Sequence, residues 1–146
     1  MSAVSPAPER SSARSRVVEV VSGAGLGVLS GFVLVGVHRM SVSLGGVELP
    51  WGLLFGAVFQ IVGCVLLIAL SGRKLPLAVF ALVFAAMSML FAGTSAGGGV
   101  LMPGEIAGVA QWQGWAVQIM GVLIPCLAIA LVWARQIRAL ARGRGR

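Results

Sequence analysis

Apolar residues fill four long stretches of this chain, and short polar or glycine-rich segments separate them. A helix rises about 1.5 Å per residue, so roughly 20 apolar residues cross the hydrocarbon core of a bilayer. The pattern therefore predicts an all-α integral membrane protein with four transmembrane helices, at about residues 17–37, 52–70, 75–94 and 113–133. They form one transmembrane domain over 17–134, between a flexible basic N-terminal tail at 1–16 and a basic C-terminal tail at 135–146.

The composition supports a membrane protein and argues against a soluble one. Of the 146 residues, 58% are hydrophobic and only 10% are charged, whereas a soluble domain carries about 25% charged residues. Too few polar side chains remain to cover a soluble core. Both cysteines, Cys64 and Cys126, fall inside apolar stretches, which makes a disulfide framework unlikely as an organising feature.

Three glycines in the first apolar stretch, Gly23, Gly27 and Gly31, follow one another at intervals of four. Residues four apart lie on the same face of a helix. In lipid, where apolar burial drives helix association only weakly, such small residues allow two backbones to approach closely. We interpret this face as a helix-packing surface.

A sequence repeat links the second and fourth apolar stretches. Residues 56–63 read G-x-x-x-Q-I-x-G, and residues 114–121 repeat the same pattern. The preceding loops share Gly-Gly-Val and a proline, at 45–50 and 98–103. Both repeated helices would cross the membrane in the same direction. The pattern therefore predicts two tandem helical hairpins, duplicated in parallel about an axis along the membrane normal.

Each copy of the repeat places two glycines and one glutamine on one helix face. A buried amide needs a hydrogen-bond partner, either the other glutamine or a backbone carbonyl exposed by the neighbouring glycines. A pseudo-two-fold axis would bring Gln60 and Gln118 face to face. The repeated pattern has three interpretations: structural glue between helices, the lining of a path for a small substrate, or chance similarity between two glycine-rich helices. The glycines expected to pack beside it are Gly56, Gly63, Gly114 and Gly121.

The charges predict the orientation in the membrane. With four spans, both termini lie on one side, and that side holds ten of the eleven Lys and Arg residues, while only Arg39 lies opposite. Cytoplasmic loops carry the excess of Lys and Arg, so both termini are predicted to be cytoplasmic. The net charge of +7 thus reflects topology and contact with anionic lipids, and we do not predict a nucleic-acid partner.

Four ionisable residues are predicted on the outer face: His38, Arg39, Glu48 and Glu105. They would either form a His–Glu or Arg–Glu pair or remain solvated in the loops. Their number and spacing do not match a metal site. The chain contains no recognisable pattern for catalysis or nucleotide binding. We therefore predict a non-enzymatic protein without a cofactor.

Residues 45–52 read GGVELPWG between two glycine-rich spans. With this loop and four spans, the chain resembles the small four-span integral membrane proteins of unknown function found in actinobacteria. The resemblance implies a multi-pass protein of the bacterial plasma membrane and assigns no catalytic residues.

Two functional hypotheses follow from these patterns, and a third, an enzyme acting on a lipid or quinone, lacks an acid/base pair of residues. The first is a small scaffold or accessory subunit that packs through its glycine-rich helix faces, as a homo-oligomer or within a larger membrane complex. The alternative is a small transporter or channel component that uses the seam of Gln60 and Gln118.

Overall fold

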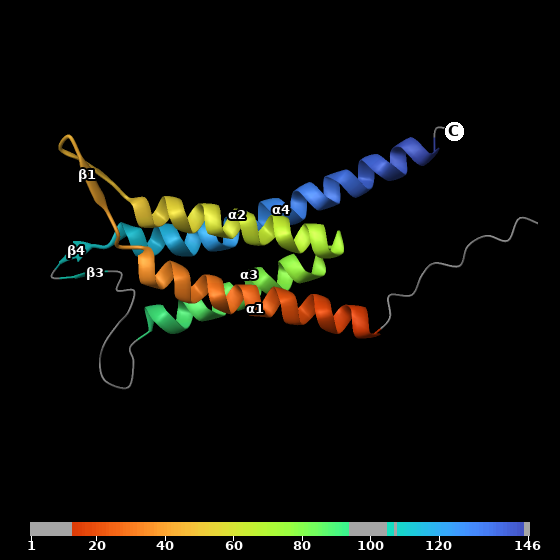
Figure 1. The fold of residues 1–146 in the computed structure, drawn as a ribbon, viewed down its shortest axis with the longest axis horizontal. Helices are drawn as coiled ribbons and strands as arrows, with labels where there is room; N and C mark the ends of the chain where they lie inside the picture. The colour runs from red at the N-terminus through yellow and green to blue at the C-terminus, as the bar shows by residue number, and fades with distance from the viewer. Residues whose placement is uncertain (1–12, 94–104, 107, 145–146) are drawn as a thin grey trace, which may run out of the picture.

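The computed structural model describes residues 13–93, 105–106 and 108–144, and within them four long helices dominate (Figure 1). The helices are α1 (Ala13–Val37), α2 (Trp51–Ser71), α3 (Leu75–Ala92) and α4 (Trp112–Arg144). All four are long and apolar enough to cross a membrane. This confirms the prediction of four helices with the length and apolar composition to cross a membrane. The tail at 1–12 and the repeated loop at 98–103 lie outside the described residues.

Two helices extend beyond the predicted spans. Helix α1 begins at Ala13, inside the predicted tail, and α4 continues past residue 134 to Arg144. Both extensions are rich in Ala and Arg, which have high helix propensity, so the helices persist where the apolar pattern stops. Helix α3 ends at Ala92, two residues before the predicted boundary.

Short β-hairpins occupy the two connections that were predicted as loops. Strands β1 (Val42–Leu44) and β2 (Val47–Leu49) pair antiparallel, as do β3 (Glu105–Ile106) and β4 (Val109–Ala110). Gly45 and Gly46 join β1 to β2 with φ angles of 58° and 88°, the positive values that a tight two-residue hairpin turn requires. The order helix, β-hairpin, helix thus occurs twice along the chain.

The four helices form a bundle in which α1 packs against α2 and α3, and α4 packs against the same two helices (Figure 1). Both β-hairpins lie at one end, which we call the hairpin end. The α2–α3 turn, the start of α1 and the end of α4 lie at the opposite end, which we call the turn end. Helices α1 and α3 therefore run in one direction, and α2 and α4 in the other.

The α2–α3 turn is short because Gly72 ends α2 in a left-handed conformation. Its φ is 62°, and its N–H donates to the carbonyl of Ile68 across 2.7 Å, as expected for a glycine helix cap. Pro76 lies in the first turn of α3, where its missing N–H costs no helical hydrogen bond. This turn fixes the position of Arg73 beside the start of α1.

Two phenylalanines of α3 fill the centre of the bundle. Phe80 and Phe84 are each 1% exposed and lie one helical turn apart. Phe80 belongs to a buried cluster towards the turn end, and Phe84 to a second cluster towards the hairpin end. The other buried members of the Phe80 cluster are Cys64, Leu67, Leu77, Ala128 and Val132. Those of the Phe84 cluster are Leu34 and Val117.

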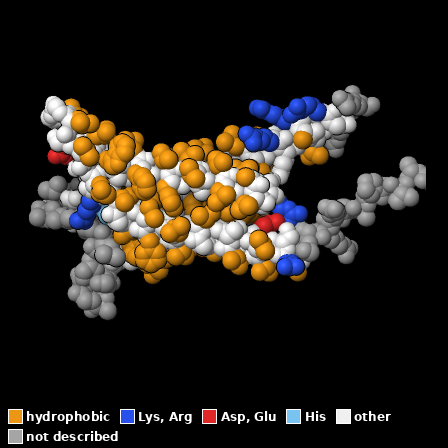
Figure 2. Space-filling view, viewed as in Figure 1, with side chains coloured by type: hydrophobic (Ala, Val, Ile, Leu, Met, Phe, Trp, Pro, Cys, Tyr) orange, Lys and Arg blue, Asp and Glu red, His pale blue; other side chains and the backbone are white. Residues whose placement is uncertain are grey.

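The outer surface of the bundle is mainly apolar. Figure 2 shows hydrophobic side chains covering the length of the bundle, with basic side chains gathered at the turn end and along the projecting part of α4. Charged side chains therefore border the apolar surface and do not interrupt it, as expected of a surface that faces lipid.

Candidate functional site

Gln60 of α2 lies fully buried in the bundle. Its side-chain nitrogen, Nε2, donates a hydrogen bond to the hydroxyl of Ser30 on α1 across 2.9 Å, and both residues have no exposed surface. The carbonyl oxygen of the amide, Oε1, has no hydrogen-bond partner among the described residues. A buried amide that is only half satisfied is a costly feature in an apolar medium.

Gln118 of α4 does not form the predicted pair with Gln60. It is half-buried and makes no hydrogen bond within the described part of the chain, whereas the adjacent Val117 is 1% exposed. The prediction of a Gln60–Gln118 pair was wrong, because Gln60 contacts Ser30 on α1 and not a residue of α4. Helix α2 turns its glutamine towards α1, while α4 turns Val117 to the core.

A signal that would have found Ser30 is present in the sequence. Gln60 and Gln118 are 58 residues apart (118 − 60), and so are Ser30 and Ser88 (88 − 30). One serine on α1 and one on α3 therefore have the same spacing as the two glutamines. Ser88 is buried, but its hydroxyl donates to the carbonyl of Ala85 across 2.9 Å. Only the first half forms the serine–glutamine hydrogen bond.

The second glycine of each repeat lies against a phenylalanine of α3. A β-carbon placed on Gly63 would lie 3.7 Å from the ring of Phe80, an ordinary contact distance. A β-carbon on Gly121 would overlap the ring of Phe84. The α3 aromatic rings thus occupy the space that both glycines leave open, most closely at Gly121.

The first glycines of the repeats are also buried. A β-carbon on Gly56 would lie 3.1 Å from Leu34 and 3.3 Å from Met120. Gly114 is buried at the start of α4. Together with Gly63 and Gly121, these glycines face the interior of the bundle.

The glycine face of α1 packs against α3. A β-carbon on Gly23 would overlap the backbone carbonyl of Pro76, and one on Gly27 would lie 3.0 Å from the carbonyl oxygen of Phe80. At Gly31 the neighbour is the side chain of Met87, also at 3.0 Å. These glycines build the bundle itself, so a partner protein would have to contact other faces.

A polar pocket at the turn end surrounds Glu19. The carboxylate oxygen Oε1 of Glu19 accepts hydrogen bonds from Nη1 of Arg73 at 3.1 Å and from the hydroxyl of Ser15 at 3.3 Å. The Glu19 side chain is 8% exposed, whereas that of Arg73 is 45% exposed. This ion pair joins Glu19 to a residue 54 positions away along the chain.

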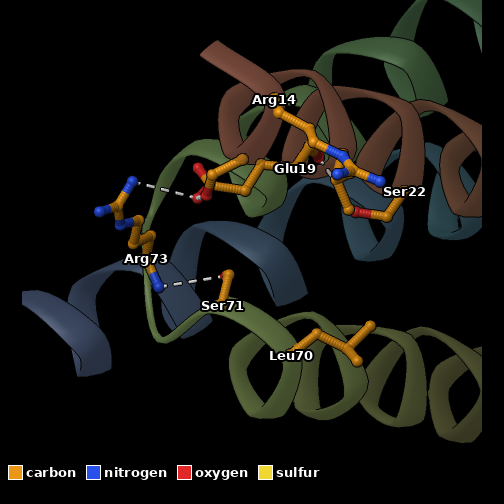
Figure 3. A pocket seen from close by; sticks show the side chains of 8 residues that line it. Arg14, Glu19, Ser22, Leu70, Ser71 and Arg73 are labelled. Atoms are coloured by element: carbon orange, nitrogen blue, oxygen red, sulfur yellow. Dashed lines mark hydrogen bonds and ion pairs between the residues drawn. The ribbon is translucent and has the colours of Figure 1, made fainter. Parts of the chain in front are cut away.

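The pocket has a volume of about 530 Å³ and lies between the start of α1 and the α2–α3 turn (Figure 3). In Figure 3, Arg73 reaches Glu19 from the turn, while Arg14 extends from α1. The second carboxylate oxygen of Glu19, Oε2, is buried and has no partner among the described residues. The lining also includes Ser22, Ser71, Val18 and Leu70.

The four candidates predicted on the outer face do not form a site. His38 is 5% exposed, and its Nδ1 donates to the carbonyl of Val35 across 2.8 Å. Arg39, Glu48 and Glu105 are exposed, and none of them forms an ion pair in the part of the chain that the structure describes. Within the same residues, no three His, Cys, Asp or Glu side chains are grouped to hold a metal ion.

The fold defines a class only in general terms: a bundle of four helices that can each cross a membrane. Comparisons with models of protein families, with curated proteins and with solved structures found no match for this chain. Function is therefore inferred from the geometry of the bundle and its polar sites.

Proposed function

We propose that this chain is a non-enzymatic, multi-pass protein of the bacterial plasma membrane that acts as a small scaffold or accessory subunit. The observation that carries this proposal is the tightly packed interior of the bundle. Phe80 and Phe84 occupy its centre and lie against Gly63 and Gly121. Among the described residues, these two rings fill the centre of a single copy, where a solute path would otherwise run.

The buried polar groups of the described bundle are separated by this apolar packing. Glu19 lies near the turn end, and Gln60 lies on the other side of the Gly23 and Gly27 contacts with α3. At about 1.5 Å per residue, the eleven residues from Glu19 to Ser30 span roughly 16 Å along α1. A chain of polar side chains that could relay an ion is not formed by the described residues.

We further propose that both termini lie in the cytoplasm. The basic residues at the turn end support this orientation, because Lys and Arg accumulate on the cytoplasmic side. The turn-end residues that the structure describes are Arg14, Arg16, Arg73, Lys74, Arg135, Arg138 and Arg142. At the hairpin end, Arg39 is the only described Lys or Arg residue.

A parallel duplication accounts for the repeated order of helix, β-hairpin and helix. The shared offset of 58 residues for both the serines and the glutamines supports this origin. The two halves have since diverged, because only Gln60 and Ser30 form the hydrogen bond. We thus propose the duplication as the origin of the fold. The proposal does not give the two glutamines a shared function.

Isolation of the chain from its native membrane tests the subunit proposal. The full-length protein, tagged at its C-terminus, would be extracted in a mild detergent, and the molar mass of the protein component measured by light scattering. We expect co-purification of another membrane protein in a fixed ratio, identified by mass spectrometry. Recovery of the chain as a monomer, in two detergents and without a stoichiometric partner, would contradict the proposal.

A small transporter or channel component is the second candidate, and one observation favours it. The carbonyl oxygen of Gln60 is buried and has no partner among the residues that the structure describes, as a group that contacts a transient solute would be. A variant with both Gln60→Leu and Gln118→Leu separates the two functions. Loss of solute flux with the partner complex intact would favour transport, whereas unchanged flux would remove this support.

A further inference from the structure

The pocket around Glu19 combines a buried acid, two basic side chains and a position at the edge of the apolar surface. Glu19 lies six residues, or about 9 Å, from the start of α1. Figure 2 shows acidic and basic side chains next to each other at this edge. In a bilayer-spanning bundle, the edge of the apolar surface lies at the level of the lipid headgroups.

The buried oxygen Oε2 of Glu19 has no hydrogen-bond donor within the described residues. Its carboxylate already has Arg73 and Ser15 on the other oxygen, and the side chain is more than nine-tenths buried. A carboxylate oxygen can only accept hydrogen bonds. The missing ligand group must therefore be a donor, and a cationic donor would form the strongest contact.

The two arginines of the pocket have the opposite requirement. Arg14 and Arg73 both line it, and a guanidinium has five N–H donors. The ion pair uses Nη1 of Arg73, which leaves donors on this side chain and on Arg14 for an anion. A phosphate oxygen is a good acceptor for such donors.

We propose that this pocket binds the headgroup of an amine-bearing zwitterionic phospholipid, such as phosphatidylethanolamine. The ammonium group donates to Oε2 of Glu19, and the phosphate lies between Arg14 and Arg73. The acyl chains leave the pocket over Val18 and Leu70, which are exposed lining residues. The proposal requires that the bundle spans a bilayer, but it does not depend on whether the protein is a subunit or a transporter.

A simpler ligand leaves part of the pocket unsatisfied. A phosphate alone would give Oε2 no donor and would lie close to the negative carboxylate. A phosphatidylcholine headgroup carries the same charges, but its quaternary nitrogen has no N–H to donate. The amine hydrogens therefore distinguish the proposed ligand, and they set the comparison that tests it.

Native mass spectrometry of the full-length protein can measure this preference. The protein would be purified in detergent and mixed with phosphatidylethanolamine, phosphatidylcholine or phosphatidylglycerol, all with the same acyl chains. We expect phosphatidylethanolamine to bind about tenfold more tightly than phosphatidylcholine, because only it forms the charge-assisted hydrogen bond. Equal binding of these two lipids, or tighter binding of phosphatidylglycerol, would overturn the proposal.

Three variants locate the preference on the protein. Glu19→Gln should abolish the difference between phosphatidylethanolamine and phosphatidylcholine, whereas Glu48→Gln, an exposed acid at the hairpin end, should leave it intact. Arg14→Gln should weaken the binding of all three lipids by a similar factor, since all three carry the phosphate. A preference that persists in a folded Glu19→Gln variant would refute the site. If the Glu19→Gln variant does not fold, the comparison of phosphatidylethanolamine with phosphatidylcholine on the unaltered protein still tests the proposal.

Discussion

The side chain of Gln60 is held by Ser30, not by its repeat counterpart Gln118. Nε2 of Gln60 donates to the Ser30 hydroxyl across 2.9 Å, and the carbonyl oxygen of the same amide is buried with no partner in the described part of the chain. Helices α1 and α2 of the first half are thus joined by a polar contact in the middle of the bundle. The hydrogen bond to Ser30 and the unpartnered carbonyl oxygen lead to opposite predictions for substitutions at Gln60 and at Ser30.

Replacing Gln60 by leucine should not destabilise the bundle. Gln60→Leu nearly preserves volume and removes an unsatisfied buried carbonyl, while the lost hydrogen bond is worth only about 0.6 kcal/mol in a membrane protein. Ser30→Ala instead leaves the whole amide unpaired and should lower the free energy of unfolding by about 1–2 kcal/mol. Unfolding titrations in mixed micelles measure both values.

Gln118→Leu is the matched control for these two variants. Gln118 is half-buried and makes no hydrogen bond within the described residues, so its replacement should change stability by less than about 0.5 kcal/mol. If Gln60→Leu proved more destabilising than Ser30→Ala, the amide would have an essential partner that this structure does not contain.

A second prediction compares the equivalent glycines of the repeat. Gly121→Ala should lower the free energy of unfolding by about 1–3 kcal/mol, because the new methyl group would overlap the ring of Phe84. Gly63→Ala places its methyl group 3.7 Å from Phe80. It should be neutral or stabilising by up to about 1 kcal/mol, through higher helix propensity. Thermal unfolding in detergent can compare the two.

Shortening the aromatic side chain provides the test of mechanism for Gly121. The variant Gly121→Ala with Phe84→Leu should recover part of the stability lost in Gly121→Ala, because leucine lacks the overlapping ring atoms. Strictly additive effects of the two substitutions would show that the glycine is needed for another reason.

The four spans could be predicted from sequence because they depend on local properties. A stretch of about 20 apolar residues must satisfy its backbone groups internally, and a helix does so. The helix ends were less predictable: α1 and α4 continue into segments where helix propensity, not apolarity, determines the structure. The strands around Gly45 and Gly46 were missed although two adjacent glycines are a known hairpin signal.

Contacts between helices could not be predicted in the same way. The repeat suggested a two-fold arrangement with Gln60 opposite Gln118, but the bundle places Gln60 against α1. The ion pair of Glu19 joins residues 54 positions apart, and nothing in the local pattern of either residue indicates the other. Such contacts depend on the order of helices around the bundle and on the rotation of each helix about its axis.

A third prediction concerns the ion pair at the turn end. Arg73→Gln removes the charge that faces the buried carboxylate of Glu19, whereas Lys74→Gln removes an adjacent charge that forms no ion pair with any described residue. We expect Arg73→Gln to lower the free energy of unfolding by about 1–2 kcal/mol. Removing one partner of a fully buried ion pair costs about 3–5 kcal/mol. The loss expected here is smaller because Arg73 is half-exposed.

The same titration should show little change for Lys74→Gln. Restoring stability by combining Arg73→Gln with Glu19→Gln would establish that the unpaired carboxylate causes the loss. Equal effects of Arg73→Gln and Lys74→Gln would instead indicate a general effect of charge at this end.

The last prediction tests the orientation of the bundle. Glu48 is exposed on β2 at the hairpin end, and Lys74 lies in the turn at the other end. In intact cells, Glu48→Cys should react with a water-soluble maleimide that does not cross membranes, whereas Lys74→Cys should react only after the cells are permeabilised. This outcome follows from the excess of basic residues at the turn end, which the positive-inside rule places in the cytoplasm.

The unaltered chain, which keeps its free Cys64 and Cys126, gives the background labelling for this experiment. Labelling of Lys74→Cys but not Glu48→Cys in intact cells would reverse the proposed orientation and place both termini outside.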